Sequence, residues 1–273
     1  MKILYIHGLG SGKYSETPKR LREAIPEAEV LSPEIPIDPI EAMWFLEDNF
    51  LNDKSIDLVV GSSLGGFYSL LLPHHKKLLA NPALFADEDI EKGIGLGEQE
   101  FLSPRENGAK TYVIDEAFIR GLAKIRSKFF NADPQHPGMP DQEQVDNTWA
   151  IFAKSDELLA HHDDFCHLFR PDHAFRMKGE HRVSEDNMRK DIVPLIKRIL
   201  KEKGGDMYYI TKACEDGSDE VVMKIDGTEK QAHEAFTKVI LEQSEEYHVK
   251  KTLKKWRVIK LFDINGKQIA QES

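Results

Sequence analysis

The chain has 273 residues, which is enough for one full hydrophobic core and a small second unit. Its 40% hydrophobic and 31% charged residues are ordinary for a soluble globular protein. The formal net charge of -10 argues against nucleic acid or an anionic membrane as the main partner. No apolar run approaches the ~20 residues that are needed to cross a bilayer.

Two features indicate the compartment. The first apolar run, residues 2–7, is too short for a signal peptide and leads into a glycine-rich turn, so we expect a first strand there. The two cysteines, Cys166 and Cys214, have no short spacing that would suggest a disulfide framework or a catalytic motif. We therefore expect a cytoplasmic protein in which neither thiol is the nucleophile.

Strands and helices alternate in the first part of the chain. Thr17 and Pro18 suit the first turn of a helix over 17–25, and Asp38 with Pro39 opens another that runs to about Phe50. Strands are expected at 2–7, 28–32, 56–60 and 77–81. This alternation predicts an α/β fold with a mostly parallel sheet that is flanked by helices.

An insertion from about 84 to 146 breaks this alternation. It is rich in aromatic residues, has little strand patterning, and ends among Pro134, Pro137 and Pro140. A segment of this length between sheet elements is commonly a lid over a site, so we expect a helical lid. The alternative is a helical excursion that only packs on the sheet. Strands at 148–153 and 174–178 and a helix over 188–203 complete the pattern.

A domain boundary is expected near Gly204, and residues 206–273 are expected to form a small α+β appendix of unknown role. Two strands, 207–211 and 220–225, precede a helix from 228 to about 246. A hairpin then joins 256–262 to 267–269 across Asn265–Gly266.

The pentapeptide Gly61-Ser62-Ser63-Leu64-Gly65 carries the main chemical signal, because it lies between an expected strand and an expected helix. In that context G-x-S-x-G is typical of a nucleophile elbow, although the motif also occurs by chance in turns. Ser63 would occupy a strained turn, and the flanking glycines would let strand and helix approach closely.

Asp156 and His181 are the expected partners of Ser63. A serine needs an imidazole to take its proton, and the imidazole needs a carboxylate to fix its tautomer. The order Ser, acid, His fits, since Asp156 follows the strand 148–153 and His181 follows the strand 174–178. The less well placed alternatives are the acids Glu157 and Asp172 and the base His173.

The oxyanion of an acyl-transfer reaction also needs donors. We expect the backbone N–H groups of Leu9 and Leu64, with the His7 ring bracing the loop and with Gly8 and Phe67 contacting substrate. The glycine-rich loop lacks the spacing of a phosphate-binding P-loop.

A second group of polar residues is more typical of a solvent-exposed helix face than of a zinc site, because structural zinc sites prefer closely spaced Cys and His ligands. We expect no metal and no cofactor. The cluster comprises His161, His162, His167, Asp163 and Asp164.

Five motifs together resemble the YqiA-like esterases, a compact bacterial branch of the α/β-hydrolase superfamily, over about residues 1–203. They are H-G-L-G-S at 7–11, G-S-S-L-G-G-F-Y at 61–68, N-P-A at 81–83, D-E-L-L at 156–159 and G-E-H at 179–181. The resemblance implies a hydrolase of short-chain esters or thioesters with Ser63, Asp156 and His181 as its triad. The family often has G-N-H where this chain has G-E-H, which puts a charged Glu180 beside the base.

Two classes of function remain open. The first is a serine esterase or thioesterase; the same triad also serves transacylation and carbon–carbon bond hydrolysis. The second is a catalytically silent scaffold in which the C-terminal domain binds a protein partner. The basic stretch 250–257 suggests nucleic acid, but residues 206–273 carry 13 acidic and 11 basic side chains, so we expect none. The acyl and leaving groups stay unassigned, and an oligomer is compatible with the sequence.

Overall fold

The computed structural model describes seven stretches of the chain, and contacts between its residues divide it into two compact units, Met1–Leu200 and Lys201–Ser273. The described residues are 1–130, 137–201, 206–213, 219–227, 232–240, 259–262 and 268–272. In these residues no helix combines the length and the apolar character that crossing a membrane requires.

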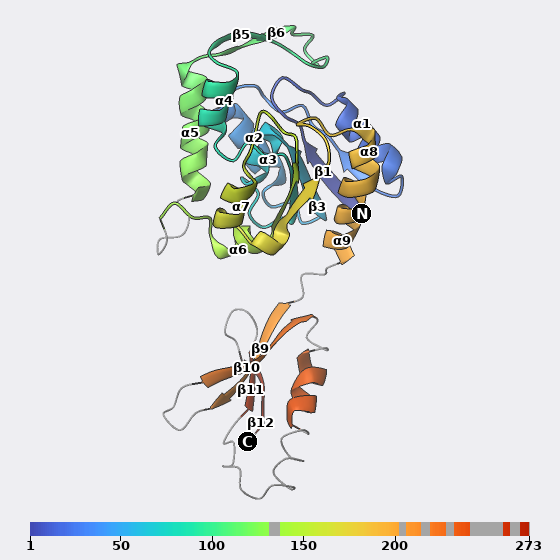
Figure 1. Ribbon diagram of the computed structural model, residues 1–273, viewed down its shortest axis with the longest axis vertical. Helices are drawn as coiled ribbons and strands as arrows, with labels where there is room; N and C mark the ends of the chain where they lie inside the picture. Colours follow the sequence, from blue (N-terminus) through green and yellow to red (C-terminus); the bar gives the residue numbers. More distant parts are fainter. Residues whose placement is uncertain are drawn as a thin grey trace, which may run out of the picture. The chain divides into compact units, whose positions relative to one another are not determined.

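A six-stranded sheet in the order β2-β1-β3-β4-β7-β8 forms the first unit's centre. Figure 1 shows this sheet among the helices of the first unit. Each pair of neighbouring strands is parallel, which confirms the predicted α/β fold. The strands are β1 Lys2–Ile6, β2 Glu29–Leu31, β3 Leu58–Ser62, β4 Lys77–Ala80, β7 Thr148–Ala153 and β8 Ala174–Met177. Because all six are parallel, their carboxyl ends meet at one edge of the sheet.

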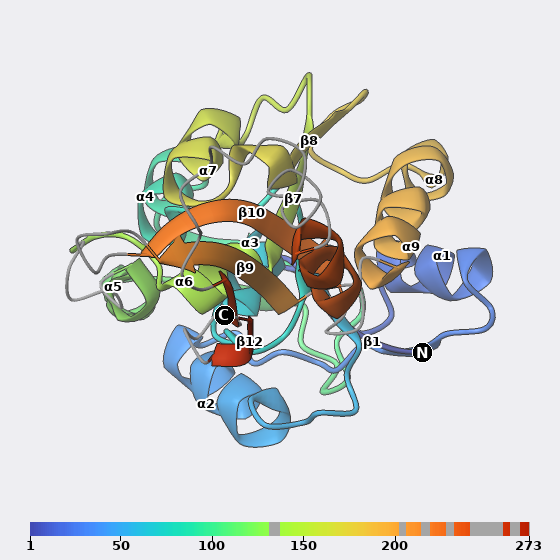
Figure 2. The ribbon, with the colours of Figure 1, turned by 90° about the horizontal axis from the view of Figure 1, so that it is seen from below.

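Helices cover both faces of this sheet (Figures 1 and 2). Side chains of β1 alternate between the faces: Ile3 and Tyr5 pack in one apolar cluster, and Leu4 and Ile6 in the other. The helices are α1 Glu16–Ala24, α8 Glu185–Asn187, a π-helix Met188–Ile192 and α9 Val193–Lys201 on the first face, and α2 Pro39–Phe50, α3 Leu64–Ser69 and α7 His162–Leu168 on the second.

The two predicted helix starts differ in outcome. At α2 the Asp38 carboxylate accepts hydrogen bonds from the backbone N–H groups of Ile40 (2.9 Å) and Glu41 (3.0 Å), as predicted. At α1 Thr17 and Pro18 lie in the first turn as predicted, but Thr17 does not cap the helix, because the N-cap is Ser15 and its side chain forms no capping hydrogen bond. The Thr17 hydroxyl instead forms a hydrogen bond with buried Tyr5.

The insertion after β4 contains helices and a hairpin. The helices are α4 Ala86–Gly93, α5 Glu116–Phe130 and α6 Gln142–Asp146, and the antiparallel strands are β5 Gly97–Glu100 and β6 Thr111–Ile114. The hairpin was not expected from the sequence, since β5 reads Gly-Glu-Gln-Glu and has no apolar side chain to mark a buried face.

The second unit is a four-stranded antiparallel sheet in the order β10-β9-β11-β12. Its strands are β9 Asp206–Ala213, β10 Asp219–Gly227, β11 Ile259–Phe262 and β12 Gln268–Glu272, and residues 232–240 form a helix. Ile210 and Leu261 pack with Phe236 and Val239 of that helix in a small core. The expected turn Asn265–Gly266 and the basic stretch 250–257 lie outside the described residues.

Lys77, the first residue of β4, is fully buried, and its Nζ donates hydrogen bonds to the carbonyls of His75 (2.8 Å) and Pro73 (3.2 Å). Burial lowers the pKa of Lys77 from 10.5 to about 7. Between about pH 7 and pH 10.5, Lys77 therefore binds a proton in the unfolded chain but not in the folded chain.

We therefore expect Lys77 to make the free energy of unfolding rise from pH 7 toward pH 10, by at most about 1.4 kcal/mol per pH unit. Urea unfolding at pH 7, 8 and 9 measures this slope. A Lys77→Met variant should show a flatter slope than the wild type. Equal slopes for the two proteins would contradict the role of Lys77.

Candidate active site

The predicted triad residues follow the strands β3, β7 and β8 at the carboxyl edge of the sheet. Ser63 comes directly after β3, Asp156 three residues after β7, and His181 four residues after β8. The strand order β3-β4-β7-β8 therefore brings three segments that are distant in sequence to one edge.

Ser63 adopts φ 54° and ψ -121°, a conformation that L-residues rarely occupy. Such a residue costs on the order of 1–3 kcal/mol and persists only where its surroundings fix it. Its N–H donates to the Ala80 carbonyl (3.0 Å), and its own carbonyl accepts from Ala83 N–H (3.2 Å) and Gly66 N–H (2.9 Å). These hydrogen bonds fix a turn between β3 and α3 that has the geometry of a nucleophile elbow.

Asp156 and His181 form a hydrogen-bonded pair. His181 Nδ1 lies 2.8 Å from Asp156 Oδ2, and the Asp156 side chain is only 2% exposed. Asp156 Oδ1 accepts from the backbone N–H groups of Leu158 (2.9 Å) and Leu159 (3.0 Å). An ionised carboxylate only accepts hydrogen bonds, so the pairing places the proton of the neutral ring on Nδ1 and leaves Nε2 able to accept one.

Among the hydrogen bonds of the described residues, none joins Ser63 Oγ to the His181 ring. Catalytic hydrogen bonds of unliganded enzymes are often long and tighten only when substrate binds. The structure thus pairs the predicted acid with the predicted base and places the serine at the same edge of the sheet.

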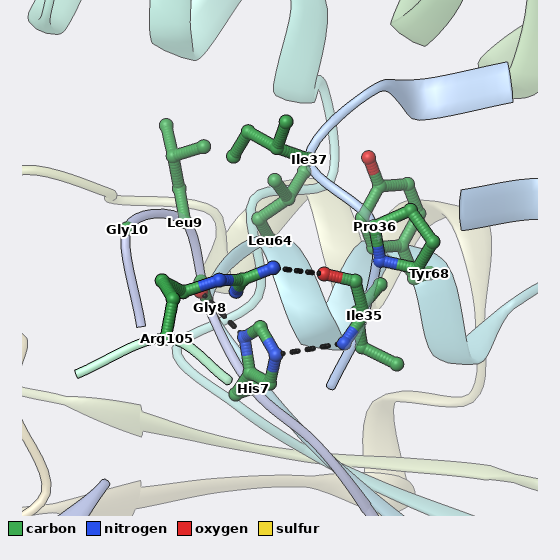
Figure 3. Close-up of a pocket in the computed structure, with 10 residues that line it drawn as sticks. All are labelled: His7, Gly8, Leu9, Gly10, Ile35, Pro36, Ile37, Leu64, Tyr68 and Arg105. Atoms are coloured by element: carbon green, nitrogen blue, oxygen red, sulfur yellow. Dashed lines mark hydrogen bonds between the residues drawn. The ribbon is translucent and has the colours of Figure 1, made fainter. Parts of the chain in front are cut away.

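A small hollow lies beside the elbow and is lined by both residues that we expect to supply oxyanion donors, Leu9 and Leu64 (Figure 3). Leu64 is the first residue of α3, so its N–H has no acceptor within the helix. The Leu9 N–H donates no hydrogen bond within the described part of the chain. Gly8 approaches the serine closely, since a Cβ on Gly8 would lie 3.3 Å from Ser63 Cβ.

His7 braces this loop through both ring nitrogens. Its Nε2 accepts from the Ile35 N–H (3.0 Å), so Nδ1 carries the proton and donates to the Gly8 carbonyl (3.1 Å) (Figure 3). Burial lowers the pKa of His7 from 6.5 to about 4, although the bond to Gly8 opposes the shift. The ring is therefore neutral at pH 7.

We expect His7 to destabilise the fold on acidification. Between pH 6.5 and 4 the unfolded chain binds a proton at this ring and the folded chain does not, so the free energy of unfolding falls by up to about 1.4 kcal/mol per pH unit. Urea unfolding at pH 6.5, 5.5 and 4.5 measures this decline in the free energy of unfolding. In a His7→Gln variant the decline should be shallower, and an unchanged decline would exclude His7 as its source.

Two residues of this hollow were not among the predicted site residues. Arg105, from the insertion, pairs with Glu34 and donates to the carbonyls of Ser11 (2.7 Å) and Ile35 (2.7 Å), so it joins the β5–β6 connection to the loop after β1. Tyr68 lies one turn after Leu64 on α3, and its buried hydroxyl has no hydrogen-bond partner among the described residues.

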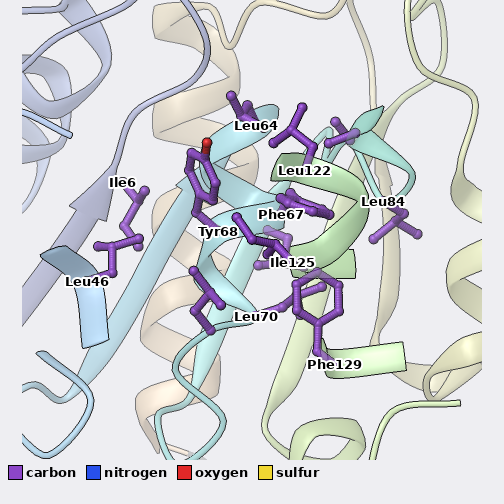
Figure 4. Packing of buried hydrophobic residues seen from close by; sticks show 14 of the residues in the cluster. Ile6, Leu46, Leu64, Phe67, Tyr68, Leu70, Leu84, Leu122, Ile125 and Phe129 are labelled. Atoms are coloured by element: carbon purple, nitrogen blue, oxygen red, sulfur yellow. The ribbon is translucent and has the colours of Figure 1, made fainter. Parts of the chain in front are cut away.

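Phe67, which we expected to contact substrate, does not line this hollow. Its side chain is fully buried and packs edge-on against Phe129 of α5, with ring centroids 5.0 Å apart (Figure 4). It joins the helix after the elbow to the insertion.

The expectation of a solvated helix face at His161 is wrong. Its side chain is 12% exposed and lies between two carboxylates, with 2.9 Å from Nε2 to Asp89 and 2.9 Å from Nδ1 to Asp164. Burial lowers the pKa of His161, but the two carboxylates outweigh it and raise the pKa above its usual value. Within the described stretches, no group of three or more His, Cys, Asp or Glu side chains is arranged to hold a metal ion.

Residues 2–197 match the uncharacterised protein family UPF0227. The chain belongs to this family. The match spans all six strands of the parallel sheet and the elbow of this UPF0227 protein.

Solved structures also resemble this UPF0227 protein. A monoacylglycerol lipase of Paleococcus ferrophilus is 11% identical with a TM-score of 0.47, over 73% of this chain and 94% of that one. A methylesterase of Arabidopsis is 13% identical with a TM-score of 0.45, over 74% and 99%. The mouse alpha/beta hydrolase domain-containing protein 10 is 16% identical with a TM-score of 0.46, over 72% and 90%. At such low identities these similarities carry no information on the reaction.

Proposed function

We propose that the protein is a serine hydrolase that cleaves short-chain carboxylic esters or thioesters through an acyl-enzyme on Ser63. The observation that carries this proposal is the strained conformation of Ser63 at a strand–helix turn, φ 54° and ψ -121°, at the sheet edge that also holds the His181–Asp156 pair. The turn itself does not require a serine at position 63, because glycine adopts such a conformation without strain.

In the proposed reaction Ser63 Oγ attacks the acyl carbon and its proton passes to His181 Nε2. Asp156 keeps the ring in the Nδ1–H form and stabilises the imidazolium. The N–H groups of Leu9 and Leu64 stabilise the oxyanion. The imidazolium then protonates the departing alkoxide or thiolate, and the ester bond breaks.

Water completes the cycle. His181 removes a proton from a water molecule, the resulting hydroxide attacks the acyl-enzyme, and the carboxylic acid leaves as Ser63 recovers its proton. The protein needs no metal or other cofactor for either half of this proposed reaction.

The lining of the hollow supports an apolar acyl group. Apolar side chains of Leu9, Ile37 and Leu64 line it together with Arg105. Its free space, about 10 Å³ or roughly the room of one water molecule, is smaller than any acyl group and does not set the chain length.

Covalent labelling by a fluorophosphonate, followed by peptide mapping, tests the nucleophile directly. We expect the wild type to be labelled on Ser63 and to hydrolyse p-nitrophenyl acetate and butyrate, with acetyl- and butyryl-CoA as the thioester arm. Ser63→Ala should lose labelling and turnover, whereas Ser62→Ala, changed at the adjacent serine, should keep both. Equal turnover by wild type and Ser63→Ala would refute the proposal, and absent labelling would favour the silent scaffold.

A further inference from the structure

Asn81, the residue directly after β4, is 1% exposed and adopts φ 45°, which is uncommon for a residue other than glycine. It is the only non-glycine residue besides Ser63 with a positive φ in the described part of the chain. Strain of this kind persists where the surroundings fix it and is frequent at functional sites. Its hydrogen bonds and packing contacts therefore identify the segments that fix Asn81 and the segments that Asn81 fixes.

The main chain on both sides of Asn81 is hydrogen-bonded to Ser63. Ala80, one residue before it, accepts a hydrogen bond from Ser63 N–H (3.0 Å), and Ala83, two residues after it, donates to the Ser63 carbonyl (3.2 Å). Pro82 lies against Gly66 of α3, where an added Cβ would come within 2.9 Å of the proline. The position of Asn81 relative to Ser63 is thus set on both sides.

The side chain of Asn81 reaches the main chain of His181 and the strand end that leads to Asp156. Its Nδ2 donates to the backbone carbonyl of His181 (2.7 Å), and its Oδ1 accepts from the N–H of Ala153 (2.7 Å), the last residue of β7 before the segment that carries Asp156. A carbonyl only accepts and an N–H only donates, so these two partners fix the orientation of the amide.

Other contacts at this edge join the acid and base segments to each other but not to the nucleophile. Ser155 N–H donates to the Gly179 carbonyl (3.0 Å), and Lys154 N–H donates to the Met177 carbonyl (2.9 Å). Among the described side chains, Asn81 is the one whose hydrogen bonds join both segments to the strand end that holds Ser63.

We propose that Asn81 is a positioning residue, which sets the location of the His181 ring relative to Ser63 by holding the His181 main chain and the end of β7. It touches no reacting atom and acts through His181. The inference rests on the proposed hydrolase function for its effect on rate. A misplacement of about 1 Å in such an arrangement can cost on the order of 10²-fold in rate.

Asn81→Gly is the informative variant, because glycine adopts φ 45° without strain and removes only the two side-chain hydrogen bonds. We expect a folded protein whose kcat and rate of fluorophosphonate labelling fall about 10²-fold while KM changes little. Asn81→Asp keeps the acceptor for Ala153 but turns an oxygen toward the His181 carbonyl, so it should lose rate as well.

Gln144→Ala is the matched control. Gln144 is also buried, and its amide donates to a main-chain carbonyl, that of Leu70 (2.6 Å), away from the triad segments. This variant should lower the melting temperature but label at the wild-type rate. Labelling of folded Asn81→Gly at the wild-type rate would overturn the proposal.

A readout that needs no turnover separates this inference from the proposed function. The proton shared by His181 Nδ1 and Asp156 should give a far-downfield NMR resonance that is absent from a His181→Gln variant. We expect Asn81→Gly, but not Gln144→Ala, to shift or broaden it. If the wild type lacks activity but the resonance depends on Asn81, positioning stands and the hydrolase proposal fails. A resonance unchanged in Asn81→Gly overturns the positioning role.

Discussion

Replacing Asp156 with Asn is expected to lower kcat for ester hydrolysis by about 10⁴-fold and to leave KM near the wild-type value. The reason lies in the hydrogen bonds of the Asp156 carboxylate. Its Oδ1 accepts from the N–H groups of Leu158 and Leu159, and its Oδ2 faces His181 Nδ1. In the variant the amide oxygen stays with the two N–H donors, so the amide NH₂ is turned toward the ring.

An NH₂ group facing Nδ1 favours the tautomer with the proton on Nε2, which cannot take a proton from Ser63. Steady-state kinetics with p-nitrophenyl butyrate measure the loss. The control is Asp172→Asn, which changes the alternative acid; that residue pairs with Arg170 at the surface and should not alter turnover. Retention of activity within about tenfold by Asp156→Asn would exclude it as the triad acid.

The four central strands, β1, β3, β4 and β7, could be predicted because each is a short, mostly apolar run that is buried on both faces. All six residues of β7 are buried, for example, so no period-two pattern is needed to find them. The candidate site could also be predicted from local signals. Ser63 is marked by its flanking glycines, and the expected acid and base each follow a recognisable strand.

The features that sequence reasoning missed depend on contacts between distant segments. Arg105 lies in a connection without a motif, and its partner Glu34 is 71 positions away. In the sequence His161 lies in a polar stretch that is typical of a helix, and its partly buried pairing with Asp89 arises only because α4 packs beside it in the fold. Asn81 was visible as part of N-P-A, but its partners, a main-chain carbonyl and a main-chain N–H, have no signature in sequence.

Gly65→Ala is expected to prevent the first unit from folding or to destabilise it by more than about 4 kcal/mol, a range that point substitutions rarely reach. A Cβ on Gly65 would lie 2.0 Å from the Ile6 carbonyl oxygen and 2.7 Å from that of His7. Neither oxygen can give way easily, because both belong to the main chain and Ile6 is paired with Gly61 inside the sheet. Near-ultraviolet circular dichroism and urea unfolding of the full chain measure the effect.

Gly93→Ala is the matched control, since nothing lies within 4 Å of a Cβ built on that glycine of α4. Alanine there should be neutral or stabilise the protein by up to about 1 kcal/mol, because it has the higher helix propensity and restricts the unfolded chain. The contrast separates the general effect of removing a glycine from the steric demand of the elbow. If Gly65→Ala unfolds at the same urea concentration as Gly93→Ala, α3 does not approach β1 as closely as the structure requires, and the strained Ser63 turn that depends on this approach loses its physical basis.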